Sequence, residues 1–391
     1  MMRTSFAVLV CAVWWTAAMP GATKKVIFPE GARTAGPYSP GILAGGFLFI
    51  SGQGAKGPDG TVPADPDAQV RQCLNNVKSV VEAAGLTIEN LVYAQVYVPE
   101  PWDYQPIHRV WTQFFGHNGP ARAMLGVAKL PDTPVEVNAV AVVDRASRRE
   151  IRTTGDPDAV VAGGLLFLSG VTADNPKDAL DRMGKVLRAA GLDYPNMVFV
   201  NPYLTSAVRS EEMNRAYAPY FEFGNTPARA TIQVANLEGG TIEFTGVAVQ
   251  DLARRRAVRP KNMEPSRTAS PCVFAGDIMF CSAKSAFIPG PNSGVYASGV
   301  EEQVRMSMRN LLDGLEEGGL KLADVVAANV YLDDMADFPQ MNEVYKTFFK
   351  ESPPARTTIQ QIAPVKERKA DDRGRWPDLE QISFIAVSQG K

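Results

Sequence analysis

The tripeptide Pro-Ala-Arg organises this chain, occurring as Pro120-Ala121-Arg122, Pro227-Ala228-Arg229 and Pro354-Ala355-Arg356. Successive copies are about 110 to 130 residues apart, which is the length of one small domain. A single tripeptide is weak evidence of a repeat, so the residues around each copy decide what the spacing means.

The same landmarks precede each copy in the same order. An apolar strand comes first, at 44–51, 162–169 and 275–282. A helix with apolar residues at spacings of three and four follows, and it ends at a glycine that fits a left-handed cap, Gly85, Gly191 or Gly319. A β-rich strand, a second helix ending in an aromatic pair, the Pro-Ala-Arg strand and a last strand complete the unit. The order predicts three internal repeats, at residues 25–146, 147–257 and 258–391.

The repeat predicts an α+β fold in which each module is a mixed sheet with two helices on one face. The other sheet face would be exposed and apolar, which is unstable in water. Three modules can bury these faces together around a barrel-like centre, so one chain forms a pseudo-trimer. We expect a monomer in solution, and a gel-filtration mass near three chains would count against it.

The polar stretches 145–152 and 254–264 suit exposed linkers, and the charged insertion 366–377 suits a solvated loop.

The N-terminal residues 1–22 have the pattern of a secretory signal. A basic start precedes the short apolar run 6–15, and small residues follow it. The run is too short for an ordinary membrane span. We therefore expect an exported, periplasmic or secreted protein with no membrane attachment after cleavage, an uncleaved anchor being the alternative.

Cysteine, histidine and charge usage exclude several kinds of chemistry. Beyond Cys11, the residues Cys73, Cys272 and Cys281 are interpreted as buried core residues, with a Cys272–Cys281 bridge as the alternative. Only two histidines are present, which disfavours a histidine-built metal site or nucleophile, and His117 is expected to be structural. A net charge of −2 without a basic run disfavours nucleic acid as a partner.

The first repeat resembles the RidA/YjgF/L-PSP family of imine and enamine deaminases. The resemblance rests on Gly36-Pro37-Tyr38-Ser39, Ile50-Ser51-Gly52-Gln53, Pro120-Ala121-Arg122 and the strand 135–141. The other repeats are divergent copies. The resemblance implies a chorismate-mutase-like fold, clefts between modules, and no metal or organic cofactor.

The resemblance also implies a set of site residues. The carboxylate-binding arginine falls on Arg122, Arg229 and Arg356, and the acidic residue falls on Glu136 and Glu243, with Gln381 beside Glu380 in the third repeat. The tyrosine-serine pair is Tyr38-Ser39, then Asp156-Pro157, then Ala269-Ser270. The predicted substrate-binding positions that remain are Ser51, Gly52, Ser169, Gly170, Met124, Thr231 and Thr358, with Ala283 in place of the glycine in the third repeat.

These residues predict hydrolysis of a small imino acid to a keto acid and ammonia. The substrate carboxylate would dock chiefly on Arg122 through two parallel hydrogen bonds. Backbone N–H groups near Gly52 and Met124 would support its oxygens, and Glu136 or Glu243 would hold the attacking water. Four alternatives stay open. They are an arginine paired with the glutamate of its own repeat, a module that binds a small carboxylate without turnover, a disfavoured endoribonuclease, and an exported hydrolase acting on another electrophilic nitrogen compound.

Overall fold

The computed structural model of the protein describes residues 24–32, 36–153, 155–261, 263–363 and 367–389. The predicted signal, 1–22, lies outside the described residues. Among the helices of the described part, none is both long and apolar enough to cross a membrane.

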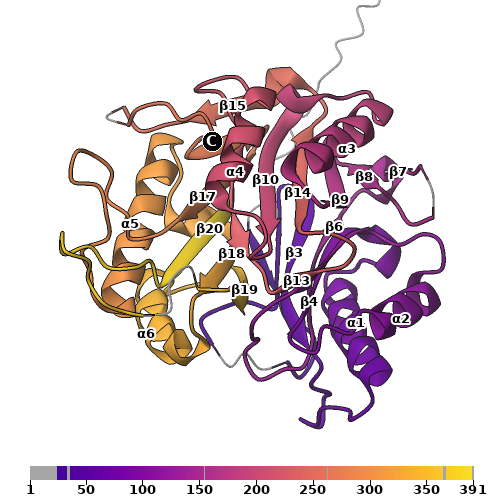
Figure 1. The fold of residues 1–391 in the computed structure, drawn as a ribbon. Coiled ribbons are helices and arrows are strands. Elements are labelled where there is room, and N and C mark those ends of the chain that lie inside the picture. The colour runs from indigo at the N-terminus through magenta and orange to yellow at the C-terminus, as the bar shows by residue number, and fades with distance from the viewer. Residues whose placement is uncertain (1–23, 33–35, 154, 262, 364–366, 390–391) are drawn as a thin grey trace, which may run out of the picture.

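Each third of the chain forms one mixed sheet with two helices on its outer face, as predicted (Figure 1). In the first module the order is β1-β2-β3-β6-β4-β5. Its strands are β1 (Lys25–Ile27), β2 (Gly41–Ala44), β3 (Phe47–Gly54), β4 (Leu91–Val98), β5 (Ala121–Gly126) and β6 (Glu136–Val142), and its helices are α1 (Pro66–Ala83) and α2 (Gln105–Phe115). β4 and β5 run parallel because α2 crosses over between them, while the other pairs are antiparallel.

The second and third modules repeat this order. The second has β7 (Arg149–Ile151), β8 (Ala159–Ala162), β9 (Leu165–Ala173), α3 (Pro176–Ala189), β10 (Met197–Leu204), α4 (Ser210–Tyr217), β11 (Ala228–Arg229), β12 (Ile232–Gln233), β13 (Asn236–Leu237) and β14 (Ile242–Val249). The third has β15 (Arg255–Val258), β16 (Cys272–Ala275), β17 (Ile278–Lys284), α5 (Val300–Glu317), β18 (Val325–Leu332), α6 (Phe338–Phe348), β19 (Ala355–Gln360) and β20 (Glu380–Val387). β13 leaves its own sheet and pairs with β5, which ties the second module to the first.

Local sequence explains where the first helix of a module begins and ends. In α1, the Asp65 side chain accepts a hydrogen bond from the Ala68 N–H and Pro66 opens the first turn. The predicted apolar stripe from Val70 to Val81 is buried against the sheet. Gly85 ends the helix with φ of 77°, a left-handed conformation that glycine adopts without steric cost.

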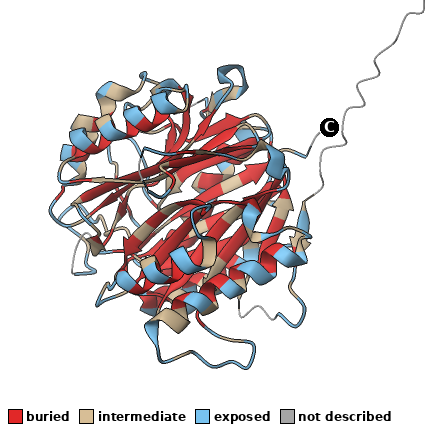
Figure 2. Cartoon of the chain, turned by 90° about the vertical axis from the view of Figure 1, so that its right-hand side faces the viewer, coloured by how far each residue is buried: buried red, intermediate tan, exposed pale blue. Residues whose placement is uncertain are grey.

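The core consists of four apolar clusters. Three lie between a sheet and its own helices, and the fourth lies at the centre, where the inner faces of all three sheets meet. Figure 2 shows the strands almost wholly buried and the helices exposed on their outer faces. Ring contacts cross the module boundaries at the centre, Phe47 with Phe167 at 5.7 Å and Phe199 with Phe280 at 5.9 Å between ring centroids. Burial of one such side chain contributes about 1.5–3 kcal/mol, so the shared centre favours the closed arrangement.

The two stretches predicted to be linkers contain short strands, and arginines in them contact the preceding module. Residues 149–151 are β7, and 255–258 are β15, which straddles the predicted boundary between 257 and 258 and pairs with β16. Arg148 donates to the carbonyls of Leu91 and Gly119, at 3.1 and 2.9 Å. Arg255 donates in the same way to Met197 and Asn225, at 3.0 and 2.8 Å. Several residues of both stretches are exposed, as predicted, among them Arg145 and Arg254. The prediction missed the strands and the arginines that satisfy carbonyls of the preceding module.

Lys24 makes the corresponding contact that closes the ring. Its ammonium donates to the carbonyls of Val325, Ser352 and Ala323, at 2.7, 2.8 and 3.3 Å, all in the third module. The beginning of the first module is thereby held against the third, although no linker joins them.

The interpretation of all three remaining cysteines as free core residues was wrong for two of them. Cys272 and Cys281 face each other across β16 and β17 and form a disulfide, while Cys73 is free and buried. Antiparallel strands bring directly opposed side chains close together, which sequence separation alone does not reveal.

The double glycine of the first predicted strand is a turn. Gly45 and Gly46 have φ of 59° and 80° and join β2 to β3. Two successive left-handed residues suit the tight turn of a hairpin.

We predict that Lys24→Ala lowers the free energy of unfolding by roughly 1–3 kcal/mol, because three carbonyls, one of them half-buried, lose a charged donor. Urea denaturation measures the loss. Lys25→Ala, which removes an exposed neighbouring side chain, is the control and should change stability little. Equal effects of the two substitutions would contradict the ring-closing role of Lys24.

Candidate functional site

The same arrangement recurs at the three boundaries between modules: the arginine comes from one module, and a serine and the residue at the acidic position come from the following one. Hollows lie beside Arg122 and Arg229, whereas Arg356 lines the central cavity. Each boundary is called a cleft and named after its arginine. The Arg122 cleft joins the first and second modules, the Arg229 cleft the second and third, and the Arg356 cleft the third and first. The three modules therefore contribute to the clefts in a cyclic order.

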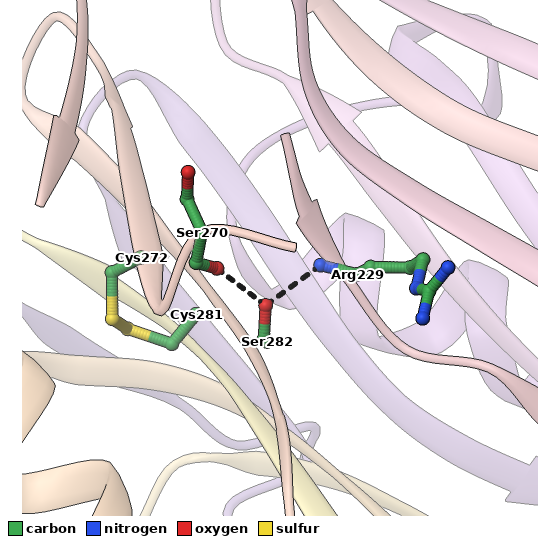
Figure 3. Close-up of a disulfide and its surroundings, with 5 residues drawn as sticks. All are labelled: Arg229, Ser270, Cys272, Cys281 and Ser282. Carbon is green, nitrogen blue, oxygen red and sulfur yellow. Dashed lines mark hydrogen bonds between the residues drawn. A yellow bond between two sulfur atoms is a disulfide. The ribbon is translucent and has the colours of Figure 1, made fainter. Parts of the chain in front are cut away.

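A serine hydroxyl fixes the arginine backbone in every cleft. Ser51 accepts the backbone N–H of Arg356 at 2.8 Å, Ser169 that of Arg122 at 3.0 Å, and Ser282 that of Arg229 at 2.9 Å. Each hydroxyl donates in turn to a carbonyl of its own module at 2.6 Å: Ser39, Pro157 or Ser270. Figure 3 shows this chain from Ser270 through Ser282 to Arg229, beside the disulfide.

Ser51 and Ser169 have another role in this geometry than the substrate binding predicted for them. Their hydroxyl hydrogens are committed to carbonyls, and each oxygen already accepts one N–H. They position the arginine of the adjoining module and have no hydrogen left to donate to a substrate.

In the Arg356 cleft, the guanidinium is buried among aromatic rings. Arg356 is 5% exposed and lies over Tyr345 at 5.0 Å, Tyr38 at 5.5 Å and Phe338 at 5.7 Å from the ring centroids. Its Nη1 has no hydrogen-bond partner among the described residues. Burial lowers the pKa of Arg356, so a bound anion would offset the cost of holding this charge away from water.

Glu136 is the carboxyl group of the same cleft. It is 7% exposed, and its Oε1 makes no hydrogen bond within the described residues. Burial raises the pKa of Glu136 to about 8, while the nearby charge of Arg356 acts in the opposite direction. Gly52 lies so close that any side chain at that position would overlap the Glu136 carboxyl group. Glycine is thus required for Glu136 to occupy this place.

The predicted grouping of Arg122 with Gly52 was wrong. Gly52 and Glu136 belong to the Arg356 cleft, whereas Arg122 meets Ser169, Gly170 and Glu243 of the second module. The sequence shows that each module carries both halves of a cleft, but not in which direction the modules follow one another around the ring.

The Arg122 cleft contains a hollow with a different charge pattern. Arg122 is paired with Asp156 at 3.0 Å and lies over Trp111 at 4.7 Å. The alternative of an ion pair with a glutamate of the same repeat is therefore also wrong, because the partner comes from the following module. His108, which the sequence analysis left unassigned, lies 3.5 Å from the guanidinium and 2.8 Å from Glu238.

The Arg229 cleft has no carboxylate at the family's acidic position. In every module the residue at this position lies opposite a tyrosine of the neighbouring strand. Glu136 is opposite Tyr97, Glu243 is opposite Tyr203, and Gln381 is opposite Tyr331. Arg229 donates to Asn214 at 2.7 Å, and Gln381 donates to the Thr231 carbonyl at 3.0 Å.

Glu380 faces away from Gln381, toward α5, where the Ser307 hydroxyl donates to it. Alternation along β20 turns neighbouring side chains to opposite faces. Burial raises the pKa of Glu380 to about 8.

A further cavity lies at the centre of the molecule, lined mainly by aliphatic side chains and phenylalanine rings, with some amide and hydroxyl side chains. Among its described lining residues, Arg356 is the one charged group, so the cavity offers no acid–base pair. In the part of the chain that the structure covers, no cluster of histidine, cysteine and carboxyl groups is suited to a metal ion.

The family model described as endoribonuclease L-PSP matches the chain three times, at residues 30–143, 156–250 and 261–368. The chain belongs to this family. Its three copies agree with the RidA/YjgF-type tandem repeats read from the sequence.

Individual relatives match one module's length at a time. The 2-iminobutanoate/2-iminopropanoate deaminase of Escherichia coli strain K12 is 43% identical over 124 residues, covering 30% of this chain and 97% of that protein. A RutC family protein of Pyrococcus horikoshii is 39% identical over 130 residues, with the same coverages. A crystal structure of a chorismatase aligns over 76% of this chain and 93% of its own, with a TM-score of 0.51 and 14% identity. That likeness shows a common fold across the modules.

We predict that Glu380→Gln stabilises the protein at pH 8. A buried carboxyl group with a raised pKa holds its proton in the folded state and loses it in the unfolded state, so wild-type stability falls as pH rises from about 5 to about 8. The variant should be roughly 1–3 kcal/mol more stable than wild type at pH 8, since one pKa unit corresponds to about 1.4 kcal/mol. Urea denaturation at pH 4.5 and pH 8 measures the difference, which should nearly vanish at the lower pH. A difference of the same size at both pH values would contradict the assignment.

Proposed function

We propose that the Arg356 cleft hydrolyses small 2-imino acids to 2-keto acids and ammonia. The observation that carries the proposal is a set of three buried atoms without partners among the described residues: Nη1 of Arg356, Oε1 of Glu136 and Oγ1 of Thr358. Buried polar atoms are normally hydrogen-bonded, so their presence together favours a ligand that satisfies them. Deaminases of 2-imino acids among the relatives support the reaction.

Arg356 would bind the substrate carboxylate. A guanidinium can donate two parallel hydrogen bonds to a carboxylate, and the surrounding rings exclude water, which strengthens both bonds. Gly36 and Tyr38 lie against the guanidinium. The substrate would therefore have to push this turn aside, and the ring of Tyr38 would then cover it.

Glu136 would move the protons of the reaction. Its carboxylate accepts a proton from water as the water oxygen attacks C2 of the protonated imine, which gives a tetrahedral carbinolamine. Glu136 then returns that proton to the amine nitrogen. The C–N bond breaks, the departing ammonia takes the hydroxyl proton, and a keto acid and ammonium remain. A carboxyl group with a pKa of about 8 is suited to both accepting and returning a proton near neutral pH.

Binding without turnover is a second candidate, favoured for the Arg229 cleft. There Gln381 replaces the acid and Ala283 replaces the glycine that makes room for it. An amide cannot accept the proton of water, yet Arg229 is half-buried and is bonded to the neutral Asn214. This cleft retains the means to hold a carboxylate, and its carboxyl groups, Asp378 and Glu380, stand at other positions than Glu136 does in the Arg356 cleft.

We predict that Arg356→Ala and Glu136→Gln each lower kcat/KM for imine hydrolysis by on the order of 10²–10³. An amino-acid oxidase generates the imine, and semicarbazide traps what remains. Arg122→Ala is the matched control, because that arginine lies in a different cleft and is already paired, and it should keep most of the activity. Full activity in Arg356→Ala together with loss of activity in Arg122→Ala would show that the reaction takes place in the Arg122 cleft, and would refute the proposal.

We also propose that the protein works as a single chain in an extracytoplasmic compartment. One chain suffices because each cleft is completed by two of its own modules. The Cys272–Cys281 disulfide supports the location, since disulfides persist mainly in oxidising compartments.

The location proposal predicts that the protein isolated from its native compartment carries the disulfide. Alkylation after denaturation without reductant should then label Cys73 and leave Cys272 and Cys281 unmodified, as read by peptide mass spectrometry. Labelling of all three cysteines would indicate a reducing compartment and contradict the proposal.

A further inference from the structure

The Arg122 cleft differs from the other two in its surplus of carboxyl groups. Asp156, Asp158, Glu238 and Glu243 line the hollow together with one cation, Arg122. His108 stands behind Arg122 and is bonded to Glu238. The charges in this hollow are therefore mainly negative, whereas the family's reaction requires a site that attracts a carboxylate.

One side of the Arg122 guanidinium is already paired with a carboxylate of the protein itself. Asp156 corresponds in position to Tyr38 of the Arg356 cleft. The residue that follows each of them accepts a hydrogen bond from the serine of its cleft through a backbone carbonyl: Pro157 from Ser169, and Ser39 from Ser51. Its carboxylate lies 3.0 Å from Nη2 of Arg122. Nη1 of Arg122 has no partner among the described residues, but an external carboxylate that reached it would enter beside Asp156 and the other carboxylates of the hollow, which disfavours organic anions.

Glu243 presents an unused acceptor to the same hollow. It is 5% exposed, and its Oε2 accepts a hydrogen bond from Thr172 at 2.9 Å. Its Oε1 has no partner in the described part of the chain. Gly170 leaves the space in which the carboxyl group lies, and a side chain there would overlap it. A buried acceptor held in this way and facing a cavity indicates a ligand that brings a donor.

The hollow also has an apolar part beside its charged groups and the hydroxyls of Ser169 and Thr172. Trp111, Met124, Val171 and Val186 contribute to the walls of the hollow. A ligand that fits both features has one positively charged donor group and a short hydrocarbon part.

We propose that the Arg122 cleft is a binding site for a small organic cation, a primary ammonium compound with a short alkyl chain. The ammonium group donates to Oε1 of Glu243 and is attracted by Asp156 and Glu238, and the alkyl chain packs against Trp111 and the valines. The proposal goes beyond the deamination assigned to the Arg356 cleft and does not depend on it. The two clefts thus have opposite charge preferences within one fold.

The test is calorimetric titration of the full mature protein with n-butylammonium at pH 8.5, where Glu243, whose pKa is raised to about 8 by burial, is largely ionised. We expect binding to wild type and at least about tenfold weaker binding to Glu243→Gln and to Asp156→Asn. Glu136→Gln, the matched change in the Arg356 cleft, should leave butylammonium affinity unchanged. Because it should remove imine hydrolysis, failure of one proposal can be told from failure of the other.

A substitution that reverses the preference makes the test sharper. Asp156 is 59% exposed in its side chain, so Asp156→Tyr, which restores the residue of the Arg356 cleft, should fold. The variant should lose butylammonium binding and gain a butanoate site that Arg122→Ala abolishes. Absence of butylammonium binding to wild type would overturn the proposal. So would wild-type butanoate binding that is weakened by Arg122→Ala but not by Arg356→Ala.

Discussion

The hydrogen bond from a serine hydroxyl to the backbone N–H of an arginine in the adjoining module is the interaction on which the clefts depend. It recurs at all three boundaries within 2.8 to 3.0 Å. The serine lies at the bulge of a central strand and the arginine on the last parallel strand of the neighbour, so the bond sets the register between two sheets. It also places an arginine at the same strand position in every cleft, whatever the surrounding side chains are. The shared apolar centre holds the modules together, and this bond determines where the chemistry can occur.

On that common frame the clefts have diverged through few residues. Tyr38, Asp156 and Ala269 occupy one position, and Glu136, Glu243 and Gln381 another. The glycine beside the acid changes with it, since Gly52 and Gly170 accompany glutamates and Ala283 accompanies the glutamine. Fusion into one chain permits such divergence, because each module can change without changing the other two. In a symmetric homotrimer the same substitution would appear in all three clefts.

Much of the fold could be read from the sequence, because glycine caps, apolar stripes and the repeated tripeptide are local signals. The order of strands and helices and the two-helix face of each sheet follow from them. The sequence does not show which arginine shares a cleft with which glutamate, since neither Gly52 nor Arg356 carries information about which module lies beside it. Arg148 and Arg255 were misjudged for a related reason: their partners are backbone carbonyls, which leave no mark in the sequence. His108 and Trp111 could have been found, because they are three residues apart on a helix that packs beside the Arg122 strand.

The most direct test of the account is a crystal structure of the protein soaked with 2-oxobutanoate, a stable analogue of the imino acid. The account predicts the keto acid's carboxylate on the Arg356 guanidinium, its carbonyl carbon facing Glu136, and Asp156 still paired with Arg122. A keto acid bound at Arg122 with Asp156 displaced, or an Arg356 cleft that stays empty while the ligand occupies another site, would contradict it.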